Sequence, residues 1–246
     1  MLNANAQRPA LQKDHTFHVL LRIFIVLASG ILATGYVYYR NYEKHFRTQA
    51  ERELSAIGDL KAGELVQWRK ERLKDGFILF ENPAFTGTVR RFFENPDDTA
   101  AREQTGTWLS KIQWHSQYER IRLLDPYGTT RMSVPEGLPP ASSMIVQSIA
   151  KVFESGLVQF QDFYYNDNDN HIRLALFVPI FDRQNNDRPL GMVVMHIDPE
   201  QYLYPLISRW PTPSRTAESL LVRREGDEVL FLNSLRFKPG AAMRLR

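Results

Sequence analysis

The 246-residue sequence predicts an α+β protein that begins with a transmembrane helix. Three observations predict this class. An apolar run near the amino terminus is long enough to cross a membrane, the next forty or so residues have the periodicity of one long helix, and the remainder changes between short helices and strands. Because short polar turns join successive strands, we expect an antiparallel sheet with flanking helices.

The apolar run occupies residues 17–39. It has no charged side chain after Arg22, which lies where a long side chain can extend to the lipid headgroups. Tyr36, Tyr38 and Tyr39 lie at its other end, as aromatic side chains do at membrane interfaces. A spanning helix needs about 20 mostly apolar residues, so we predict a retained anchor in contact with membrane lipid. The alternative is a cleaved signal peptide, whose apolar region would be shorter.

The charges that flank this run do not determine its orientation. Residues 1–16 carry two basic side chains and have no periodicity, so they are predicted to form a short tail. Four basic residues follow the run between positions 40 and 52. Because both flanks are basic, the rule that cytoplasmic flanks carry the excess of lysine and arginine does not choose between them.

The composition excludes several classes of function. The net charge is only +3, and the basic residues form neither a patch nor a known reader motif, so no nucleic-acid partner is expected. The chain has no cysteine, which excludes disulfides, thiolate metal sites and cysteine nucleophiles. It also lacks the motifs of serine hydrolases, zinc proteases and phosphate-binding loops. We therefore predict that the chain is not an enzyme, has no catalytic residues and binds no cofactor.

Residues 40–81 are predicted to form one long helix. They contain no proline, and Asn82-Pro83 ends the pattern because the residue before proline avoids helical geometry. The apolar side chains fall on one stripe, and the stripe is longer than one small domain needs. We therefore expect two copies of the chain to form a parallel homodimer through its first half. The stripe consists of Phe46, Ala50, Leu54, Ile57, Leu65 and Trp68.

Residues 82–198 are predicted to form a compact module. Two helices come first, at 85–93 and from 97 to about 115, and the second is capped by aspartate. Two strands, a helix ended by Gly156 and three more strands follow, which is the element order of a PAS-like domain. The five strands are expected at Glu119–Asp125, Thr129–Val134, Leu157–Tyr165, His171–Phe181 and Leu190–Asp198.

Residues 199–216 are predicted to form a linker, and residues 217–246 the beginning of a second PAS-like module. The linker opens with a helix capped by Asp198, with Tyr202, Leu206 and Trp210 on its apolar face, and continues as an extended segment. A second hairpin follows, with strands at 219–224 and 228–233. Because too few residues remain for a whole module, we expect a truncated chain in which this hairpin exposes apolar surface and opens easily.

Three stretches resemble a known family. They are LKAGELVQWRKERLKDG (60–76), YERIRLLDPYGTTRMS (118–133) and GMVVMHIDPEQYLYPLISRWPTPSRTAESLLVRREGDEVLFLNSLR (191–236). Together they are similar to the periplasmic double Cache sensor region of bacterial membrane-bound sensor histidine kinases and diguanylate cyclases. The resemblance implies a bacterial inner-membrane protein with a cytoplasmic tail at 1–16, a single span in this chain and residues 41–246 in the periplasm. The chain departs from the family plan because no second span or output domain follows.

A pocket for an unknown small molecule is expected on the sheet. Strand alternation places Arg122 opposite Ile121 and Leu123, and Arg173 alternates with apolar neighbours. Arginines and tyrosines on a sheet face under a helix can bind a small carboxylate, whereas the alternative is that these arginines face solvent. The amino-acid-binding pattern of some double Cache domains is not evident. The predicted ligand-binding residues are Arg122, Arg173, Tyr164, Trp114 and Asp198, with the helix at 108–114 as one wall and Tyr164 on the same face of its strand as Val158, Phe160 and Asp162.

No metal site is predicted. The sequence Asp167-Asn168-Asp169-Asn170 is acidic, but an EF-hand beginning at Asp167 would need glycine at position 172 and glutamate at position 178, which are isoleucine and valine. The segment is therefore expected to be a polar hairpin tip. His115, His171 and His196 have no spacing typical of metal ligands and are expected to be ordinary polar residues.

Two functions remain open from the sequence. The first is an extracytoplasmic sensory input region that detects a small ligand and passes a helix shift through the membrane. The alternative is a membrane-anchored PAS-like protein with a binding or structural role and no signalling output. The long helix favours the sensor, because a simple tether would tolerate a flexible linker at the same place.

Overall fold

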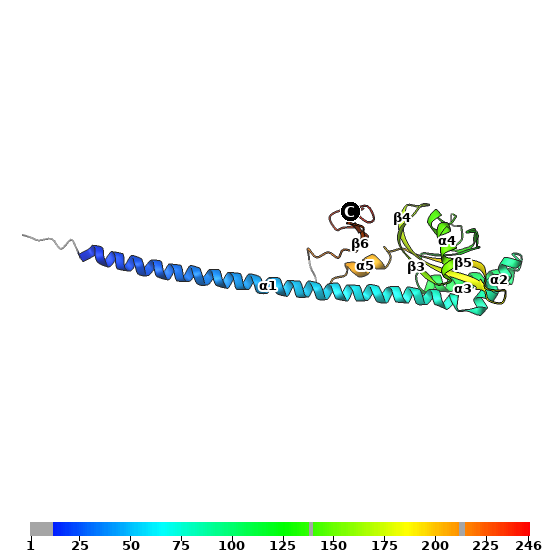
Figure 1. Cartoon of the computed structure of the whole chain (residues 1–246), viewed down its shortest axis with the longest axis horizontal. Helices are drawn as coiled ribbons and strands as arrows, with labels where there is room; N and C mark the ends of the chain where they lie inside the picture. Colours follow the sequence, from blue (N-terminus) through cyan, green and yellow to red (C-terminus); the bar gives the residue numbers. More distant parts are fainter. Residues whose placement is uncertain (1–11, 138–139, 212–214) are drawn as a thin grey trace, which may run out of the picture. The chain divides into compact units, whose positions relative to one another are not determined.

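The computed structural model describes residues 12–137, 140–211 and 215–246, with side chains from Phe17 onward. The chain divides into two units, Met1–Leu60 and Lys61–Arg246. Its elements, labelled in Figure 1, are α1 (Gln12–Phe80), α2 (Pro83–Glu94), α3 (Thr99–His115), β1 (Arg120–Leu124), β2 (Thr130–Val134), α4 (Ser143–Ser155), β3 (Gln159–Asn166), β4 (His171–Asp182), β5 (Arg188–Ile197), α5 (Leu203–Ser208), β6 (Val222–Glu225) and β7 (Glu228–Phe231).

Helix α1 confirms the long helix predicted from the sequence. It begins at Gln12, inside the predicted tail, and residues 1–11 of that tail lie outside the described residues. From Phe17 the helix contains a window that is long and apolar enough to cross a membrane, and none of that window is buried. The helix ends at Phe80, and Asn82 caps α2 by accepting hydrogen bonds from the backbone of Ala84 and Phe85.

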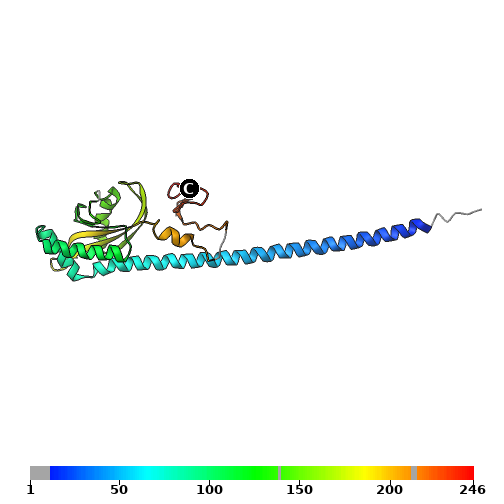
Figure 2. The ribbon, with the colours of Figure 1, turned by 180° about the vertical axis from the view of Figure 1, so that it is seen from behind.

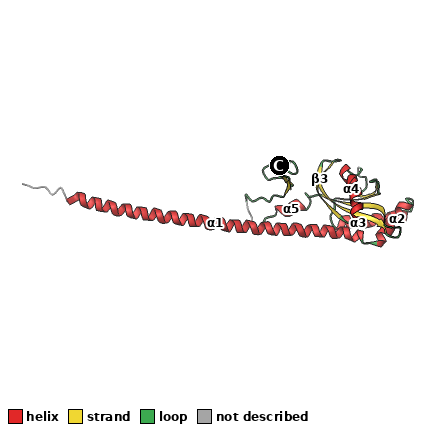
Figure 3. Ribbon diagram, viewed as in Figure 1, coloured by secondary structure: helices red, strands yellow, loops and turns green. Residues whose placement is uncertain are grey.

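Five strands form one antiparallel sheet in the order β2-β1-β5-β4-β3. Figure 3 shows these strands between helices. The two long strands, β5 and β4, lie inside the sheet, the predicted hairpin of β1 and β2 lies at one edge, and β3 forms the other edge. This arrangement confirms the predicted α+β class and the PAS-like order of elements.

Both faces of the sheet are buried. The residues of β4 and β5 are apolar almost without interruption, as strands covered on both sides are. Helices α2 and α3 and the last part of α1 cover one face, which we call the α3 face, and α4 covers the other, the α4 face (Figures 1 and 2). The core of the α3 face includes Trp68, Phe85, Leu109, Ile121, Leu123, Val193 and Met195, and that of the α4 face includes Ile145, Ile149, Val152, Phe177, Met192 and Val194.

The predicted common face of four residues in and before β3 is wrong. Val158, Phe160, Asp162 and Tyr164 do not share a face, because the pairing of β3 with β4 shifts between Gln161 and Tyr164. A bulge of this kind reverses the alternation of side chains. Val158 and Phe160 therefore contact the α3-face core, whereas Tyr164 belongs to the α4-face core.

Helix α5 begins later than predicted. Asp198 does not cap it; the segment from Asp198 to Gln201 forms a turn, and the helix begins at Leu203. The backbone nitrogen of Tyr204 donates to the carbonyl of Pro199 at 2.8 Å, which holds this turn against the helix. The helix buries Leu203 and Ile207, not the predicted stripe that begins at Tyr202, whose side chain is about half exposed. Part of the predicted extended linker, residues 212–214, lies outside the described residues.

Strands β6 and β7 confirm the second hairpin as a separate two-stranded sheet. Leu230 and Leu232 contact the α3-face core, and the Tyr204 hydroxyl donates to the carbonyl of Leu232 at 2.5 Å. The carboxyl-terminal segment lies along β7, since the nitrogen of Phe231 donates to the carbonyl of Leu245 at 3.0 Å. That this hairpin begins a second module stays a prediction.

Candidate ligand-binding site

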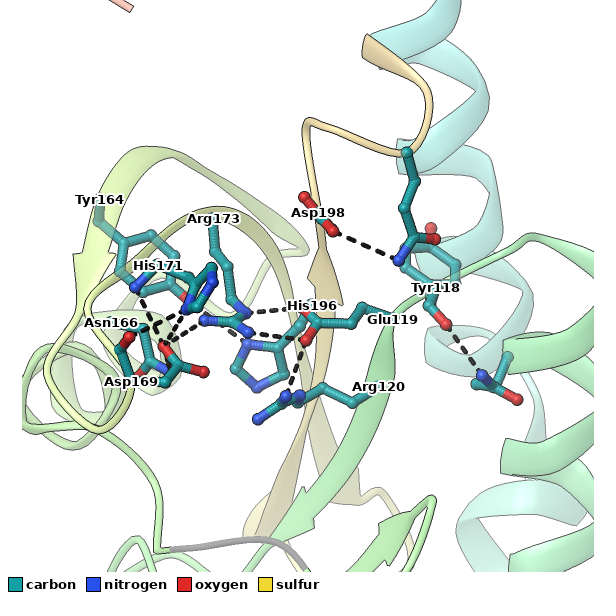
Figure 4. Close-up of polar contacts among 12 residues, drawn as sticks. Tyr118, Glu119, Arg120, Tyr164, Asn166, Asp169, His171, Arg173, His196 and Asp198 are labelled. Carbon is teal, nitrogen blue, oxygen red and sulfur yellow. Dashed lines mark hydrogen bonds and ion pairs between the residues drawn. The ribbon is translucent and has the colours of Figure 1, made fainter. Parts of the chain in front are cut away.

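Seven polar side chains gather on the α4 face of the sheet, and we call them the arginine cluster. They come from β1 and the residue before it, from β3, from β4 and the turn before it, and from β5, so four neighbouring strands position them. Alternation along β1, β4 and β5 turns Arg122, Arg173 and His196 away from the α3-face core and toward α4. Glu119 and Asp169 lie outside the strands and join the cluster through their contacts with Arg173. The arginine cluster consists of Glu119, Arg120, Arg122, Tyr164, Asp169, Arg173 and His196, and Figure 4 shows all of these except Arg122.

Arg173 is the centre of the ion pairs. Its Nε and Nη2 contact the two carboxylate oxygens of Glu119 at 2.6 and 2.7 Å, which is the two-pronged geometry in which a guanidinium binds a carboxylate most strongly. Its Nη1 donates to Asp169 Oδ1 at 2.6 Å, and Arg120 donates to Glu119 at 2.7 Å (Figure 4). The guanidinium of Arg173 is thus fixed on both sides.

His196 lies between these charges and is only 1% exposed. Its backbone is paired with Arg120 on β1 and Ala175 on β4, and its Nδ1 is 3.2 Å from the Tyr164 hydroxyl. Burial lowers the pKa of His196 well below its usual value, and the charges of Arg122, Arg120 and Arg173 lower it further. The imidazole is therefore neutral at neutral pH and can donate only one hydrogen bond.

The cluster has a net positive charge, and hence a positive electrostatic potential, because it holds three arginines and only two carboxylates, those of Glu119 and Asp169. The arginines outweigh Asp169 in their effect on the pKa of His196. Burial raises the pKa of Tyr164. Burial also opposes ionisation of Glu119, but the hydrogen bonds and charge of Arg173 outweigh it, so the pKa of Glu119 is lowered and the carboxylate stays ionised. A buried face with this potential stabilises an additional negative charge.

The turn between β3 and β4 connects the cluster to α4. Asp169 of this turn contacts Arg173, while Asp167 accepts hydrogen bonds from the backbone and hydroxyl of Ser143, the first residue of α4. Asn168 Nδ2 donates to the carbonyl of Pro140 at 2.8 Å. The turn was predicted to be a polar tip, and it also holds the start of α4 beside the cluster. Within the described ranges, no three histidine or acidic side chains are placed to hold a metal ion.

Three of the five predicted site residues lie together in the cluster. Arg122, Tyr164 and Arg173 are all buried, so the alternative that these arginines face solvent is wrong. Trp114 is 85% exposed on α3, and α3 covers the opposite face of the sheet. The predicted wall at residues 108–114 is therefore wrong, because Ile121 and Leu123 point toward α3 while Arg122 points away from it.

Asp198 also lies outside the cluster. Its Oδ1 accepts a hydrogen bond from the nitrogen of Glu200 at 2.9 Å, and Figure 4 shows its side chain apart from those of Tyr164, Arg173 and His196. It lines a separate cavity of about 140 Å³ beside the last part of α1, together with Trp68, Arg72 and Gln201.

Sequence reasoning missed Glu119, Asp169 and His196 as site residues. For His196 a signal existed, because alternation places it on the same face of β5 as Met192 and Val194. For Asp169 and Glu119 the sequence held no comparable signal. Both contact Arg173 only because the turn and the start of β1 come together at one end of the sheet.

Comparison with solved structures shows which known proteins have a similar fold. No family model matches the chain, and no curated protein sequence matches it. The ligand-binding domain of the Pseudomonas aeruginosa PAO1 amino acid chemoreceptor PctC, in complex with GABA, is 14% identical with a TM-score of 0.52, over 80% of this chain and 80% of that one.

Two further solved structures are similar at lower scores. The sensor domain of the V. cholerae histidine kinase DctB is 15% identical with a TM-score of 0.47, over 60% of this chain and 55% of that one. The sensory domain of the Campylobacter jejuni chemoreceptor Tlp3, with isoleucine bound, is 10% identical with a TM-score of 0.48, over 63% and 61%. The chain thus spans about half of the DctB chain that it matches. The similarity to PctC confirms the predicted resemblance to Cache-type sensor domains at the level of the fold.

Proposed function

We propose that this chain is the extracytoplasmic sensory input region of a membrane-bound signalling protein and that the arginine cluster binds a small anionic ligand. The observation that carries the proposal is the positive potential of a buried face, where three arginines surround a neutral histidine. An anion bound there would gain charge-assisted hydrogen bonds in a site of low dielectric constant. The fold adds support, since the similar ligand-binding domain of PctC was solved with GABA, which carries a carboxylate.

A carboxylate is the ligand group that we favour. Guanidinium groups bind carboxylates through paired hydrogen bonds, as Arg173 already binds Glu119 in this structure. Arg122 and His196 lie on the same sheet face as Arg173, and both are buried. Since the amino-acid-binding pattern is not evident in the sequence, the proposal is limited to small carboxylates and similar anions.

The signal would pass through α1. The last part of this helix packs on the sheet through Trp68 and Leu79, and the same helix contains the apolar stretch near the amino terminus. A ligand that shifts the sheet against Trp68 and Leu79 would therefore displace the last part of α1, and helix displacement is a common means of transmembrane signalling. We propose an output of the sensor histidine kinase or diguanylate cyclase type.

The site is tested with the full chain purified in detergent. A set of small carboxylates is screened for a rise in melting temperature, and the best of them is then measured on Arg122→Gln. We expect this substitution to abolish the rise, whereas Arg188→Gln, which changes a half-exposed arginine on β5 outside the cluster, should preserve it. A full ligand response in Arg122→Gln would contradict the proposed site.

The location is tested with reporter fusions. We propose a bacterial inner-membrane protein with one span near residues 17–39, a cytoplasmic tail at 1–16 and residues 41–246 in the periplasm. Alkaline phosphatase fused after Arg246 should then be active in the bacterial cell. An inactive phosphatase together with an active cytoplasmic reporter at the same junction would reverse this orientation.

A further inference from the structure

His196 is the member of the arginine cluster whose ordinary pKa lies near neutral pH. One ring nitrogen, Nδ1, is 3.2 Å from the Tyr164 hydroxyl. The other, Nε2, is buried and has no hydrogen-bond partner among the residues that the structure describes. Buried polar atoms are normally satisfied by protein, water or a ligand. The ring is therefore fixed on one side and available to a bound group on the other.

The strands packed around His196 supply the charged groups that affect its pKa. β1 contributes arginines beside it, β4 contributes one more, and β3 contributes the tyrosine. α4, which covers this face, buries only apolar side chains against it. The titratable and charged groups that act on His196 are Arg122, Arg120, Arg173 and Asp169, with Tyr164 at its Nδ1 and Glu119 bound to two of the arginines.

We propose that the cluster binds its anionic ligand together with one proton, which His196 takes up from solvent. The inference rests on the proposed function, because it concerns the same site. Without a ligand, the nearby guanidinium groups keep the imidazole neutral. A bound anion offsets their charge and supplies a hydrogen-bond acceptor for the Nε2 proton, while Nδ1–H donates to the Tyr164 oxygen. No covalent bond forms or breaks in this step.

The two binding events support each other. A proton on His196 strengthens the attraction for the anion, and the anion raises the proton affinity of His196 by the same factor, because such coupling is reciprocal. Where the free site is neutral and the occupied site is protonated, the affinity for the anion rises by up to about tenfold for each unit that the pH falls. The site thus favours small anions and becomes more sensitive to them in acid.

The test measures proton uptake on the full chain in detergent. Lactate, pyruvate and sulfate serve as probes, because their charges are constant between about pH 5.5 and 8. Calorimetry at one pH, in two buffers of different ionisation enthalpy, gives the number of protons taken up. We expect a positive number, up to about one per bound anion, and a rise in affinity as the pH is lowered.

Two variants identify the group that takes up the proton. His196→Asn cannot ionise but retains a side chain that can hydrogen bond with Tyr164, so its anion affinity should lose this pH dependence. His171→Asn is the matched control, because His171 lies beside the cluster but is exposed and contacts Asp169 rather than the arginines. It should keep the wild-type dependence. If His196→Asn does not fold, the titration of His196 in the isotope-labelled wild type, with and without the probe, gives the same answer.

The outcomes separate the two proposals. Anion binding without proton uptake would overturn the inference while leaving the proposed binding site in place. An unchanged pH dependence in His196→Asn would also overturn it, because the proton would then bind elsewhere. Failure of every probe to bind at any pH in this range would count against both.

Discussion

At the scale of single residues, Arg173 has a structural role that the sequence did not indicate. It is buried and contacts two carboxylates at 2.6 to 2.7 Å, one from Glu119 just before β1 and the other from Asp169 in the turn between β3 and β4. Breaking a buried pair is costly because it leaves the partner charge unpaired. A residue predicted only to bind ligand therefore also stabilises the fold.

We expect Arg173→Ala to lower the free energy of unfolding by about 2 to 4 kcal/mol, somewhat less than for a fully buried pair because Glu119 and Asp169 retain some solvent contact. Arg173→Lys should lose less, since lysine keeps the charge but not the two-pronged geometry. Urea unfolding followed by circular dichroism measures both variants. Arg188→Ala, at a half-exposed ion pair, is the control and should change stability by under about 1 kcal/mol. If Arg173→Ala, Arg173→Lys and Arg188→Ala had the same free energy of unfolding, the ion pairs of Arg173 would not stabilise the fold.

His196 should make the protein less stable in mild acid when no ligand is bound. Its pKa is lower in the folded chain than in the unfolded chain, so below about pH 6.5 the unfolded state binds more protons. The free energy of unfolding therefore decreases as the pH is lowered. Above that pH the effect is absent. The lowered pKa values of Glu119 and Asp169 act in a more acidic range, below their ordinary values of 4.5 and 3.8.

Urea unfolding of the wild type and His196→Asn between about pH 5 and 7.5 should therefore diverge. We expect the wild type to lose stability toward pH 5, by at most about 1.4 kcal/mol per pH unit from this group, and the variant to lose less. Parallel curves for the two proteins would contradict the assignment of this effect to His196.

At the scale of elements, the two faces of α3 are the clearest check on the fold. Leu109 is fully buried against the sheet, whereas Trp114 is exposed. Leu109→Ala should lower the free energy of unfolding by about 2 to 5 kcal/mol. Trp114→Ala should change it by no more than about 0.5 kcal/mol and should leave ligand binding unchanged. Thermal unfolding of both variants measures this difference, and a large loss in Trp114→Ala would place α3 on the sheet by its other face.

The sequence was sufficient where local chemistry decides the structure. Asn82, Asp98 and Gly156 fixed helix ends, and alternation in β1 separated Arg122 from Ile121. It was insufficient where distant segments decide. Nothing in α3 indicates which sheet face it covers, so Trp114 was placed in the wrong site. The bulge in β3 depends on pairing with β4, and for this reason the predicted common face of Phe160 and Tyr164 was wrong.

The hairpin of β6 and β7 should open more easily than the central sheet. It has two strands, and Leu220, Val222 and Val229 remain about half exposed. Small isolated hairpins are marginally stable, although Leu230 and Leu232 give this one some contact with the core. Hydrogen exchange on the full chain in detergent should show residues 219–233 exchanging far faster than 171–198. Equal protection would mean that the hairpin completes the first module.

At the scale of the whole molecule, the apolar stripe of the first unit is not covered by any residue that the structure describes in that unit. Phe46 and Leu54 are 65% and 57% exposed. Together with Ala50 and Ile57 they fall on one helical face, because steps of three and four residues return to the same side of a helix. Exposed apolar stripes of this kind favour pairing with a second helix, and two chains anchored in one membrane would meet in parallel.

The prediction that follows is a homodimer that crosslinks along this stripe. The natural chain has no cysteine, so single cysteines can be introduced without further changes. We expect oxidation in membranes to crosslink chains that carry cysteine at position 46, 50, 54 or 57. Cysteines at Thr48, Arg52 and Asp59 are matched controls, because at about 100° per residue they lie on the opposite side of the helix and should crosslink far less. Crosslinks at all seven positions would indicate random collision, and their absence at all four stripe positions would exclude a dimer through this helix.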